Sequence, residues 1–430
     1  MTAPHGLRAI PTEDRAWMMA GLADAMRGVA PIVPVAPGTD PDEIAALQRQ
    51  PLPEGTALVV RTSGSSGVPK AVALSADALR AGAEATAERF GGHGQWLVAL
   101  PTHLISGLQM LVRSEIAGTQ PVFFDGHFDP EAFLERAEML EADRRYVSLV
   151  PVQLARLFDF VEQDREAADV LRRFDAVLVG GQAVSLALRS RAHVLGIGLK
   201  RSYGMTETSG GCVYDGVEIG DTRVRIRGGE VQLAGSSLAL GYVGDPELTA
   251  RTFITESGRD GVPVRWYRTG DSGELLGGML TVTGRLDRVI ISGGVNVSLD
   301  AVERVVREQP GWESAVALSA PHPEWGERAS LVVEIEGGAG DPDSGTETPA
   351  PIRASFDHVQ QAIRGALGPA AVPEWATEIG EIPKLAGGKT DYAELGEWLT
   401  RLRSSFSEVR RGDTRAAARE ETSRGEKDQA

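Results

Sequence analysis

Residues 57–90 read ALVVRTSGSSGVPKAVALSADALRAGAEATAERF, and this stretch indicates the fold class. The apolar, β-branched run at 57–62 predicts a buried strand. Ser75 is a typical helix N-cap residue, and the alanine-rich sequence that follows predicts a helix to residue 90. We therefore expect a strand, a loop and a helix, with the loop at the carboxyl edge of a sheet, where α/β proteins bind ligands.

The loop TSGSSGVPK (62–70) has the composition of a phosphate-binding loop. Its glycines allow the chain to curl tightly around an anion, its hydroxyls add donors, and Lys70 adds a positive charge. Its spacing differs from that of a Walker A loop. Taken alone, the loop is equally typical of a Ser- and Gly-rich surface turn, so other segments must decide.

The rest of the chain divides into regions with different patterns of predicted helices and strands. Predicted strands at 95–101, 174–181 and 199–204, with a helix at 182–196, indicate an α/β fold with mostly parallel sheets. Short strands with glycine turns at 222–283 predict a small β-rich subdomain. From residue 287 onward, mixed helices and strands predict a small α+β C-terminal domain.

These patterns of predicted helices and strands indicate the following domain organisation. Residues 1–286 form a large N-terminal domain, and residues 287–400 form the C-terminal domain, with a loop insertion at 336–351. Residues 401–430 have mixed charge and few bulky apolar side chains, so we expect a disordered tail.

Composition narrows the function classes. The net charge of −16 over 430 residues argues against a general nucleic-acid binder. The single cysteine, Cys212, allows no disulfide within the chain, which is typical of a cytoplasmic protein. No apolar run is long enough for a membrane span, and we recognise no signal peptide at the N-terminus.

Four further segments carry chemically suited residues. SYGMTETSGG (202–211) offers a tyrosine face for a base, a threonine hydroxyl for phosphate and a glutamate for Mg²⁺. YRTGDSGEL (267–275) places an aspartate in a glycine-flanked turn, suited to a ribose diol. GRLDRVIISGGVN (284–296) joins the two predicted domains, and IPKLAGGKTDY (382–392) holds a lysine on a Gly-rich loop. Each residue alone has a plain structural explanation, such as core packing, an Asx-turn or an exposed lysine.

Together and in this order, the five segments resemble the core motifs of the acyl-adenylate-forming superfamily, which contains acyl-CoA synthetases, adenylation domains and luciferases. The resemblance implies that ATP is used with Mg²⁺, which Glu207 helps to hold, and that Lys389, Thr206 and Lys70 are catalytic. It implies that Asp287 is the hinge of a mobile C-terminal domain, and that Gly293 and Gly294 line the path of CoA, the co-substrate. The ATP-binding residues that it implies are Thr62, Ser63, Gly64, Ser65, Ser66, Gly67, Lys70, Gly181, Gln182, Ala183, Ser202, Tyr203, Gly204, Met205, Thr206, Asp271 and Arg285.

A narrower resemblance rests on three stretches and on a short N-terminal region. LPTHLISGLQMLVRSEIAG (100–118), YGMTETSGGCVYDG (203–216) and DRVIISGGVNVS (287–298) resemble the o-succinylbenzoate–CoA ligases of actinobacterial menaquinone biosynthesis. This resemblance implies that o-succinylbenzoate is activated as an acyl-AMP and transferred to CoA. The acid-binding residues that we infer are Ser106, Arg113, Ser209 and Gly210.

Some points stay open at this stage. Arg113, Lys200 and Arg201 are the cationic candidates for the second carboxylate of this acid. Leu104 stands where the family often has histidine, which puts a role for His103 in doubt. The alternatives are another aryl- or acyl-CoA ligase, a stand-alone adenylation enzyme that loads a carrier protein, and a non-catalytic binding protein. The expected partners are small molecules, and the oligomeric state is left open, a homodimer being one option.

Overall fold

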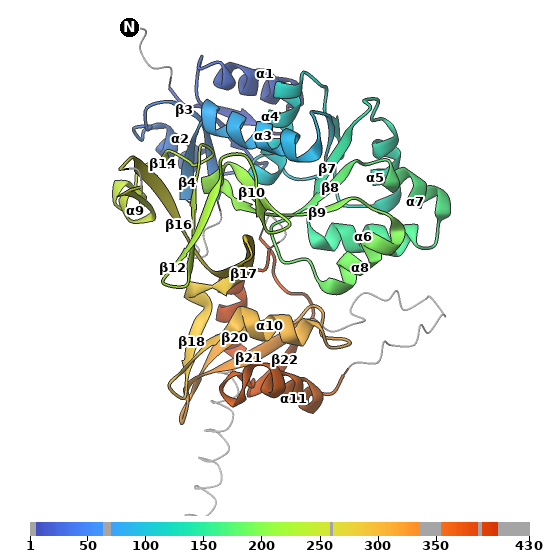
Figure 1. Ribbon diagram of the computed structural model, residues 1–430, viewed down its shortest axis with the longest axis vertical. Helices are drawn as coiled ribbons and strands as arrows, with labels where there is room; N and C mark the ends of the chain where they lie inside the picture. The colour runs from blue at the N-terminus through green and yellow to red at the C-terminus, as the bar shows by residue number, and fades with distance from the viewer. Residues whose placement is uncertain (1–5, 63–69, 259–260, 335–353, 386–388, 403–430) are drawn as a thin grey trace, which may run out of the picture. The chain divides into compact units, whose positions relative to one another are not determined.

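A computed structural model describes residues 6–62, 70–258, 261–334, 354–385 and 389–402 of the chain. The chain forms two compact units (Figure 1). The first runs to Arg288 and also includes Lys389, and the second begins at Val289. Among the described residues, no helix is long and apolar enough to cross a membrane.

The central sheet of the first unit is mostly parallel. Its strands β5 to β9 run parallel to their neighbours, and β10 and β11 add an antiparallel edge. In order across the sheet, the strands are β11 (Val217–Glu218), β10 (Gly210–Tyr214), β9 (Leu199–Met205), β8 (Ala176–Val179), β7 (Arg145–Leu149), β5 (Gln95–Val98) and β6 (Val122–Phe123).

Helices cover both faces of the central part of this sheet, which explains why the middle strand β8 (AVLV) is apolar and buried along its whole length. Trp96 and Tyr146 belong to one core, whereas their chain neighbours Leu97 and Val147 belong to another, because successive side chains in a strand point to opposite faces. The first core also contains side chains from α1 (Arg15–Met26), α3 (Ala76–Phe90) and α4 (Ile105–Ala117). The second contains side chains from α5 (Pro130–Glu138), α6 (Pro151–Val161), α7 (Arg165–Arg172) and α8 (Leu186–Leu195).

A second sheet contains the two strands that flank the predicted phosphate loop in the chain. Its strand order is β1 (Arg8–Pro11), β2 (Ile32–Val35), β3 (Thr56–Thr62), β4 (Lys70–Ser75) and β14 (Gly241–Tyr242), with α2 (Pro41–Gln48) nearby in the chain. The prediction that a helix follows the loop directly is wrong, because β4 pairs antiparallel with β3 before the helix begins. The predicted cap is confirmed, since the Ser75 hydroxyl accepts a hydrogen bond from the amide of Ala78.

The expected β-rich subdomain is the third sheet. It contains β12 (Arg223–Arg227), β13 (Glu230–Ala234), β16 (Pro263–Leu276) and β15 (Phe253–Ser257), with β17 (Met279–Arg285) paired to β16 and α9 (Pro246–Thr252) preceding β15. The sequence predicted a turn at Asp271, but this residue lies within β16, opposite Arg285 of β17. The left-handed φ of +72° at Gly270 and a register shift after Ser272 interrupt the strand's regularity, which explains the turn-like sequence.

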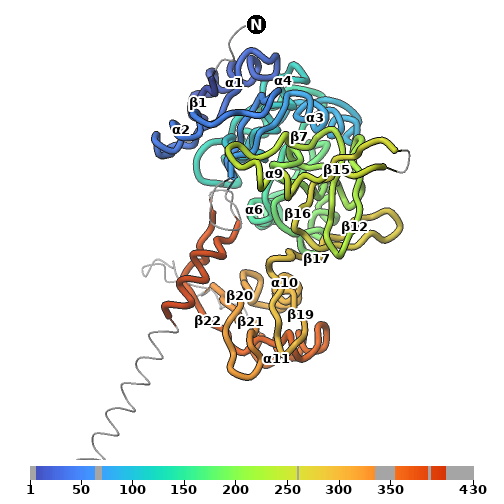
Figure 2. Tube along the Cα trace, turned by 90° about the vertical axis from the view of Figure 1, so that its left-hand side faces the viewer, coloured from blue at the N-terminus to red at the C-terminus, as the bar shows by residue number. Residues whose placement is uncertain are grey.

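The second unit has α+β architecture (Figure 2). Its strands are β19 (Val295–Ser298), β18 (Val289–Ser292), β21 (Gly326–Glu334) and β20 (Val316–His322), with β22 (Trp375–Ile379) paired parallel to β21. Its core includes apolar side chains of α10 (Leu299–Arg307) and α11 (Phe356–Leu367), and η3 (Pro369–Ala371) follows α11. Together with the first unit, this architecture confirms the predicted fold class.

Two sequence predictions concern an internal segment and the C-terminal end of this unit. The predicted insertion at 336–351 and the tail from residue 403 lie outside the described residues. Arg401 and Leu402, which the sequence prediction placed in the tail, are helical, because a helix capped by Asp391 continues from residue 392 to residue 402.

Candidate active site

The loop after β8 and the end of the neighbouring strand β9 lie at one edge of the central sheet. Gly181, Gln182 and Ala183 follow the end of β8 and are exposed, and Gly181 has a left-handed φ of +83°. They stay outside the helix because α8 begins only at Leu186, capped by Ser185. The neighbouring parallel strand β9 continues through Ser202, Tyr203, Gly204 and Met205, which are half-buried. The predicted nucleotide-binding residues of both segments therefore lie at the edge where ligands are usually bound in α/β proteins.

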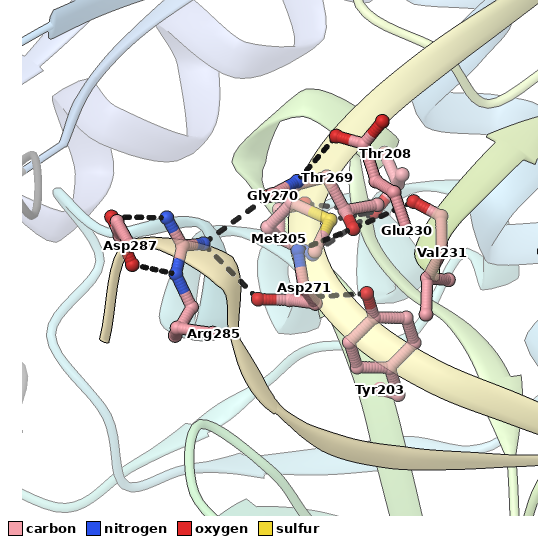
Figure 3. A network of polar contacts seen from close by, with 10 residues as sticks. All are labelled: Tyr203, Met205, Thr208, Glu230, Val231, Thr269, Gly270, Asp271, Arg285 and Asp287. Carbon is pink, nitrogen blue, oxygen red and sulfur yellow. Dashed lines mark hydrogen bonds and ion pairs between the residues drawn. The ribbon is translucent and has the colours of Figure 1, made fainter. Parts of the chain in front are cut away.

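A network of polar contacts joins β9 to the third sheet (Figure 3). The Tyr203 hydroxyl donates to Oδ2 of Asp271 at 2.7 Å, and Nη1 of Arg285 donates to Oδ1 at 3.1 Å. Arg285 also holds both oxygens of Asp287, at 3.1 and 3.0 Å, and Asp287 lies in η2 (Leu286–Arg288). The structure thus brings together four residues that the sequence analysis had assigned to nucleotide binding or to the hinge.

The charges in this network are set by burial and by pairing. Burial raises the pKa of Asp271, and the Tyr203 hydrogen bond and the Arg285 charge oppose this effect. Hydrogen bonds from its guanidinium to Asp287 raise the pKa of Arg285, with a further contribution from Asp271, so that this side chain stays charged. Burial also raises the pKa of Tyr203, so its hydroxyl remains a donor. The network presents fixed polar groups suited to a diol.

Glu230 supports the backbone beside Asp271 (Figure 3). Its Oε1 accepts from the amide of Gly270 at 3.2 Å, and its Oε2 accepts from Arg268 and Gln232 at 2.9 and 3.0 Å. Although burial opposes ionisation, these donors together lower the pKa of Glu230, so the carboxylate is charged. Glu230 is therefore a positioning residue that the sequence analysis did not find.

The chain turns sharply after β9. Thr206 and Glu207 are buried in η1 (Thr206–Thr208), and the turn ends at Ser209, which has a left-handed φ of +55°. Gly204 is required here, because a Cβ on it would lie 2.1 Å from the carbonyl oxygen of Gly210. The sequence therefore positions the Thr206 and Glu207 side chains by a close approach of two backbone segments.

The carboxylate of Glu207 and the ammonium of Lys70 share one neighbour. The hydroxyl of Tyr242 donates to Oε1 of Glu207 at 2.8 Å, and Nζ of Lys70 lies 5.7 Å from the centroid of the Tyr242 ring. Lys70 pairs with Thr62 at the base of the β3–β4 hairpin. The predicted phosphate-binding residues Ser63, Gly64, Ser65, Ser66 and Gly67 lie outside the described residues.

A buried positive charge lies on α4. Arg113 is 5% exposed, donates to the Tyr214 hydroxyl at 3.2 Å, and stacks over the ring of Trp96 at 4.7 Å. Within the described residues it has no carboxylate partner, and its buried Nε makes no hydrogen bond. Burial without such a partner lowers its pKa and makes the charge costly, so a bound anion would satisfy it.

Gln109 of α4 contacts the turn that bears Ser209 and Gly210. Gln109, one helical turn before Arg113, donates through Nε2 to the carbonyl oxygen of Ser209 at 2.5 Å. Its Cγ would lie 3.1 Å from a Cβ on Gly210, so Ser209 and Gly210 lie directly against α4. Ser106, at the start of this helix, is exposed. Of the other cationic candidates, Arg201 already pairs with Asp215 at 3.2 Å.

The donor set is compatible with one magnesium ion bound together with a phosphate ligand. Among the described residues, no group of three or more His, Cys, Asp or Glu side chains could hold a metal ion by itself. Magnesium is commonly bound by one or two carboxylates and by substrate phosphates. Glu207 fits this mode, since the described residues offer no hydrogen bond to its Oε2 while Oε1 is held by Tyr242.

Comparison with known proteins agrees with this geometry. A family model described as AMP-binding enzyme matches residues 29–232. A probable 2-succinylbenzoate–CoA ligase of Mycobacterium tuberculosis is 34% identical over 391 residues, which cover 88% of this chain and 94% of that protein. The chain belongs to the AMP-binding enzyme family. This result confirms the resemblance to acyl-adenylate-forming enzymes that the sequence motifs indicated.

Further relatives of this AMP-binding enzyme agree. A 2-succinylbenzoate–CoA ligase of Salmonella typhimurium is 30% identical over 357 residues, covering 81% of this chain and 70% of that protein. The solved structure of an o-succinylbenzoate CoA synthetase from Bacillus subtilis, in complex with the acyl-adenylate intermediate OSB-AMP, has a TM-score of 0.71. It is 20% identical, covers 92% of this chain and 89% of its own, and shows that the fold is shared.

Of the remaining predicted residues, Gly293 and Gly294 belong to the second unit and Lys389 belongs to the first. Gly293 and Gly294 form the exposed turn between β18 and β19, with left-handed φ values of +58° and +81°. A Cβ on Gly293 would lie 2.5 Å from the ring of Trp325, so glycine is required at this position. Lys389 is exposed and precedes Thr390, which forms an isolated antiparallel bridge with Lys384. The roles of all three residues stay predictions.

Three supporting residues of this enzyme were not predicted from the sequence. Gln109 could have been found, because it lies four residues before Arg113 and so shares its helix face. Tyr242 and Glu230 could not, because their partners Glu207 and Gly270 lie 35 and 40 residues away in the chain. No local pattern carries such pairings.

Proposed function

We propose that this AMP-binding enzyme is an AMP-forming acid–thiol ligase that activates o-succinylbenzoate and transfers it to CoA. The observation that carries the proposal is the 34% identity to the Mycobacterium tuberculosis relative over nearly the whole of both chains. The buried Arg113 supports the same acid, which has a second carboxylate besides the one that is activated.

The first half-reaction joins the acid to AMP. A carboxylate oxygen forms a bond to the α-phosphorus of ATP while the bond between that phosphorus and the β-bridging oxygen breaks, and pyrophosphate leaves. The task of the protein is to hold two anions together, which positioning and fixed positive charge achieve. Lys70 and Thr206 are proposed to hold phosphate oxygens, and Lys389 is proposed to act in this step.

The nucleotide is proposed to be held by the residues around β9 and β16. Tyr203 would stack on the adenine, bordered by Gly181, Gln182 and Ala183, while Asp271 and Arg285 hold the ribose hydroxyls. When bound, Mg²⁺ would neutralise charge on the phosphates, and Oε2 of Glu207 is the oxygen that the protein offers to it.

The acid is proposed to lie along α4. The turn bearing Ser209 and Gly210 leads from Thr206 to Gln109, and Arg113 follows Gln109 by four residues, about 6 Å along the helix. The activated carboxylate would lie at the turn, and the aromatic carboxylate would pair with Arg113. Ser106 is proposed to line the same pocket.

The second half-reaction transfers the acyl group. The CoA thiol releases its proton to solvent and its sulfur forms a bond to the acyl carbon. The bond from that carbon to the AMP oxygen breaks, and AMP leaves with the electron pair. Gly293 and Gly294 are proposed to line the pantetheine path, with Asp287 as the hinge position of a mobile C-terminal domain. We also propose a cytoplasmic location, which the single, buried cysteine supports.

Arg113 provides a sharp test of the acid. The comparison is between o-succinylbenzoate and 4-oxo-4-phenylbutanoate, which lacks only the ring carboxylate. The wild-type enzyme should favour the dicarboxylate by about 100-fold in kcat/KM, since a buried charge pair is worth roughly 2–5 kcal/mol. Arg113→Met should remove most of this preference without changing the KM for ATP, as measured by pyrophosphate release.

The monocarboxylate serves as the internal control for this variant, because it cannot pair with Arg113. A variant that folds, uses both acids and keeps the wild-type preference would refute the assignment of Arg113. Loss of activity with both acids in equal measure would show that the arginine acts on the fold of the pocket instead.

A further inference from the structure

Tyr242 lies between the two charged groups proposed to handle the metal and the phosphates. It is 6% exposed, its hydroxyl donates to Oε1 of Glu207 at 2.8 Å, and its ring faces Nζ of Lys70 at 5.7 Å from the centroid. A hydroxyl serves the negative group and an aromatic face serves the positive one, which are the complementary uses of a tyrosine.

The backbone on both sides of Tyr242 is fixed to the same two segments. The amide of Ala239 donates to the carbonyl oxygen of Glu207 at 2.8 Å. The amides of Leu240 and Val243 donate to Ala73 and Ala71 of β4, the strand that begins at Lys70, each at 2.8 Å. Residues 239–243 therefore connect the Glu207 turn to the strand that carries Lys70.

A guanidinium strengthens this connection. Nη1 and Nη2 of Arg265 donate to the carbonyl oxygens of Ala239 and Leu240 at 2.6 and 2.8 Å. Arg265 also stacks over the ring of Phe253, at 4.2 Å. The tyrosine is thus held by backbone pairing and by a second layer of contacts, so its hydroxyl has a defined position before any ligand binds.

The hydrogen bond to Glu207 has a direct consequence for the carboxylate. A hydrogen bond to an ionised group is roughly twice as strong as a neutral one and restricts the rotation of the acceptor. With Oε1 held by Tyr242, Oε2 is the oxygen presented to a ligand. A carboxylate oxygen can only accept, so the Tyr242 hydroxyl is the donor in this contact.

We propose that Tyr242 is a positioning residue that couples the carboxylate of Glu207 to the ammonium of Lys70, so that the metal and the phosphates of one nucleotide are received together. The inference rests on the proposed function, in which Glu207 faces Mg²⁺ and Lys70 faces phosphate. Tyr242 itself touches neither ligand.

The test measures equilibrium binding of the non-hydrolysable analogue α,β-methylene-ATP to the full chain, in EDTA and across a Mg²⁺ series. Tyr242→Phe removes the hydroxyl and keeps the ring, and Tyr242→Leu removes both. Tyr146→Phe is the matched control, because Tyr146 is also buried and its hydroxyl donates to the carbonyl oxygen of Gly92 at 3.0 Å, within a core. Melting temperatures are recorded for all variants.

Tyr242→Phe should raise the Mg²⁺ concentration for half-maximal tight binding about tenfold and leave binding in EDTA unchanged. Tyr242→Leu should show the same shift and should also weaken binding in EDTA several-fold, because Lys70 loses its aromatic neighbour. Tyr146→Phe should leave the Mg²⁺ midpoint at its wild-type value, whatever its melting temperature. In Glu207→Gln protein, adding Tyr242→Phe should cause no further shift, since the two residues act through one contact.

A wild-type Mg²⁺ midpoint in folded Tyr242→Phe would overturn the inference, as would an equal loss of binding with and without Mg²⁺. No acid is added, so these outcomes do not depend on which acid the enzyme uses. If wild-type protein shows normal Mg²⁺-dependent binding but does not activate o-succinylbenzoate, the proposed acid is wrong and the inference on Tyr242 stands. Absence of Mg²⁺-dependent nucleotide binding in wild-type protein would overturn both.

Discussion

At the scale of single residues, Asp271 shows how a binding group is kept at a cost to the fold. Asp271 is 7% exposed, and its carboxylate is held from two sides, by the Tyr203 hydroxyl and by Arg285. Burial nevertheless raises its pKa above the ordinary value. The folded protein therefore binds a proton at the Asp271 carboxylate more tightly than the unfolded chain does.

The sign of this pKa shift gives a prediction. A group with a raised folded-state pKa favours folding at low pH, and this contribution is lost as the pH rises through the raised pKa. Asp271→Asn should therefore leave the melting temperature unchanged or higher at pH 7.5, with a smaller difference from wild type at acid pH. The KM for ATP should rise about tenfold, or ~1.4 kcal/mol, because Arg285 and the ribose lose a charged partner.

Thermal unfolding across a pH series and steady-state pyrophosphate release check the two halves of this prediction separately. A large drop in melting temperature at neutral pH, with an unchanged KM for ATP, would mean that Asp271 serves the fold rather than the nucleotide.

Single residues also show what the sequence could reveal. Tyr203, Asp271 and Arg285 stand in recognisable motifs, and the structure brings them into contact. Tyr242 and Glu230 carry no such signal, because each is defined by a partner on a distant strand. Chemistry at a motif can be predicted locally, whereas the groups that orient it are chosen by the tertiary fold.

At the scale of elements, the region around Ser75 shows what local signals can and cannot locate. Ser75 was predicted as a cap and accepts the expected hydrogen bond. The strand β4 just before it was missed, because a short apolar run such as KAVALS has no period that separates a strand from the start of a helix. Its identity depends on pairing with β3 on one side and β14 on the other.

The placement of α4 depends on a close backbone approach, which can be tested. A Cβ on Gly107 would lie 2.3 Å from the carbonyl oxygen of Pro101 and 2.5 Å from that of Leu100. Gly107→Ala should therefore displace the start of α4, which carries Ser106 and Gln109, and destabilise the first unit by about 1–3 kcal/mol. Urea unfolding followed by circular dichroism measures this change.

Gly365 is the matched control, since it lies within α11 and a Cβ there meets no atom within 4 Å. Gly365→Ala should stabilise the second unit by about 0.5–1 kcal/mol, because glycine is a poor helix residue. If both substitutions had equal effects, close packing at Gly107 would not be what fixes α4.

At the scale of the whole molecule, the candidate site of the first unit draws on different sheets. Tyr242 of β14 contacts Glu207 after β9, and Tyr203 of β9 contacts Asp271 of β16. The α/β class was predictable from strands and helices that alternate along the chain, and the β-rich subdomain from short strands separated by glycine turns. The joining of sheets was not, because it depends on contacts between residues far apart in sequence.

The proposed reaction is tested by mass detection of the products that the enzyme forms from Mg-ATP, CoA and o-succinylbenzoate. We expect pyrophosphate, AMP and one thioester, with little thioester from fatty or other aryl acids. In the same assay, Lys389→Ala should lose pyrophosphate release while still making thioester from supplied acyl-adenylate.

Thioester from other acids but not from o-succinylbenzoate would contradict the proposed substrate. Adenylate without transfer to CoA would favour a carrier-loading enzyme. No pyrophosphate with any acid would contradict the proposed catalysis altogether.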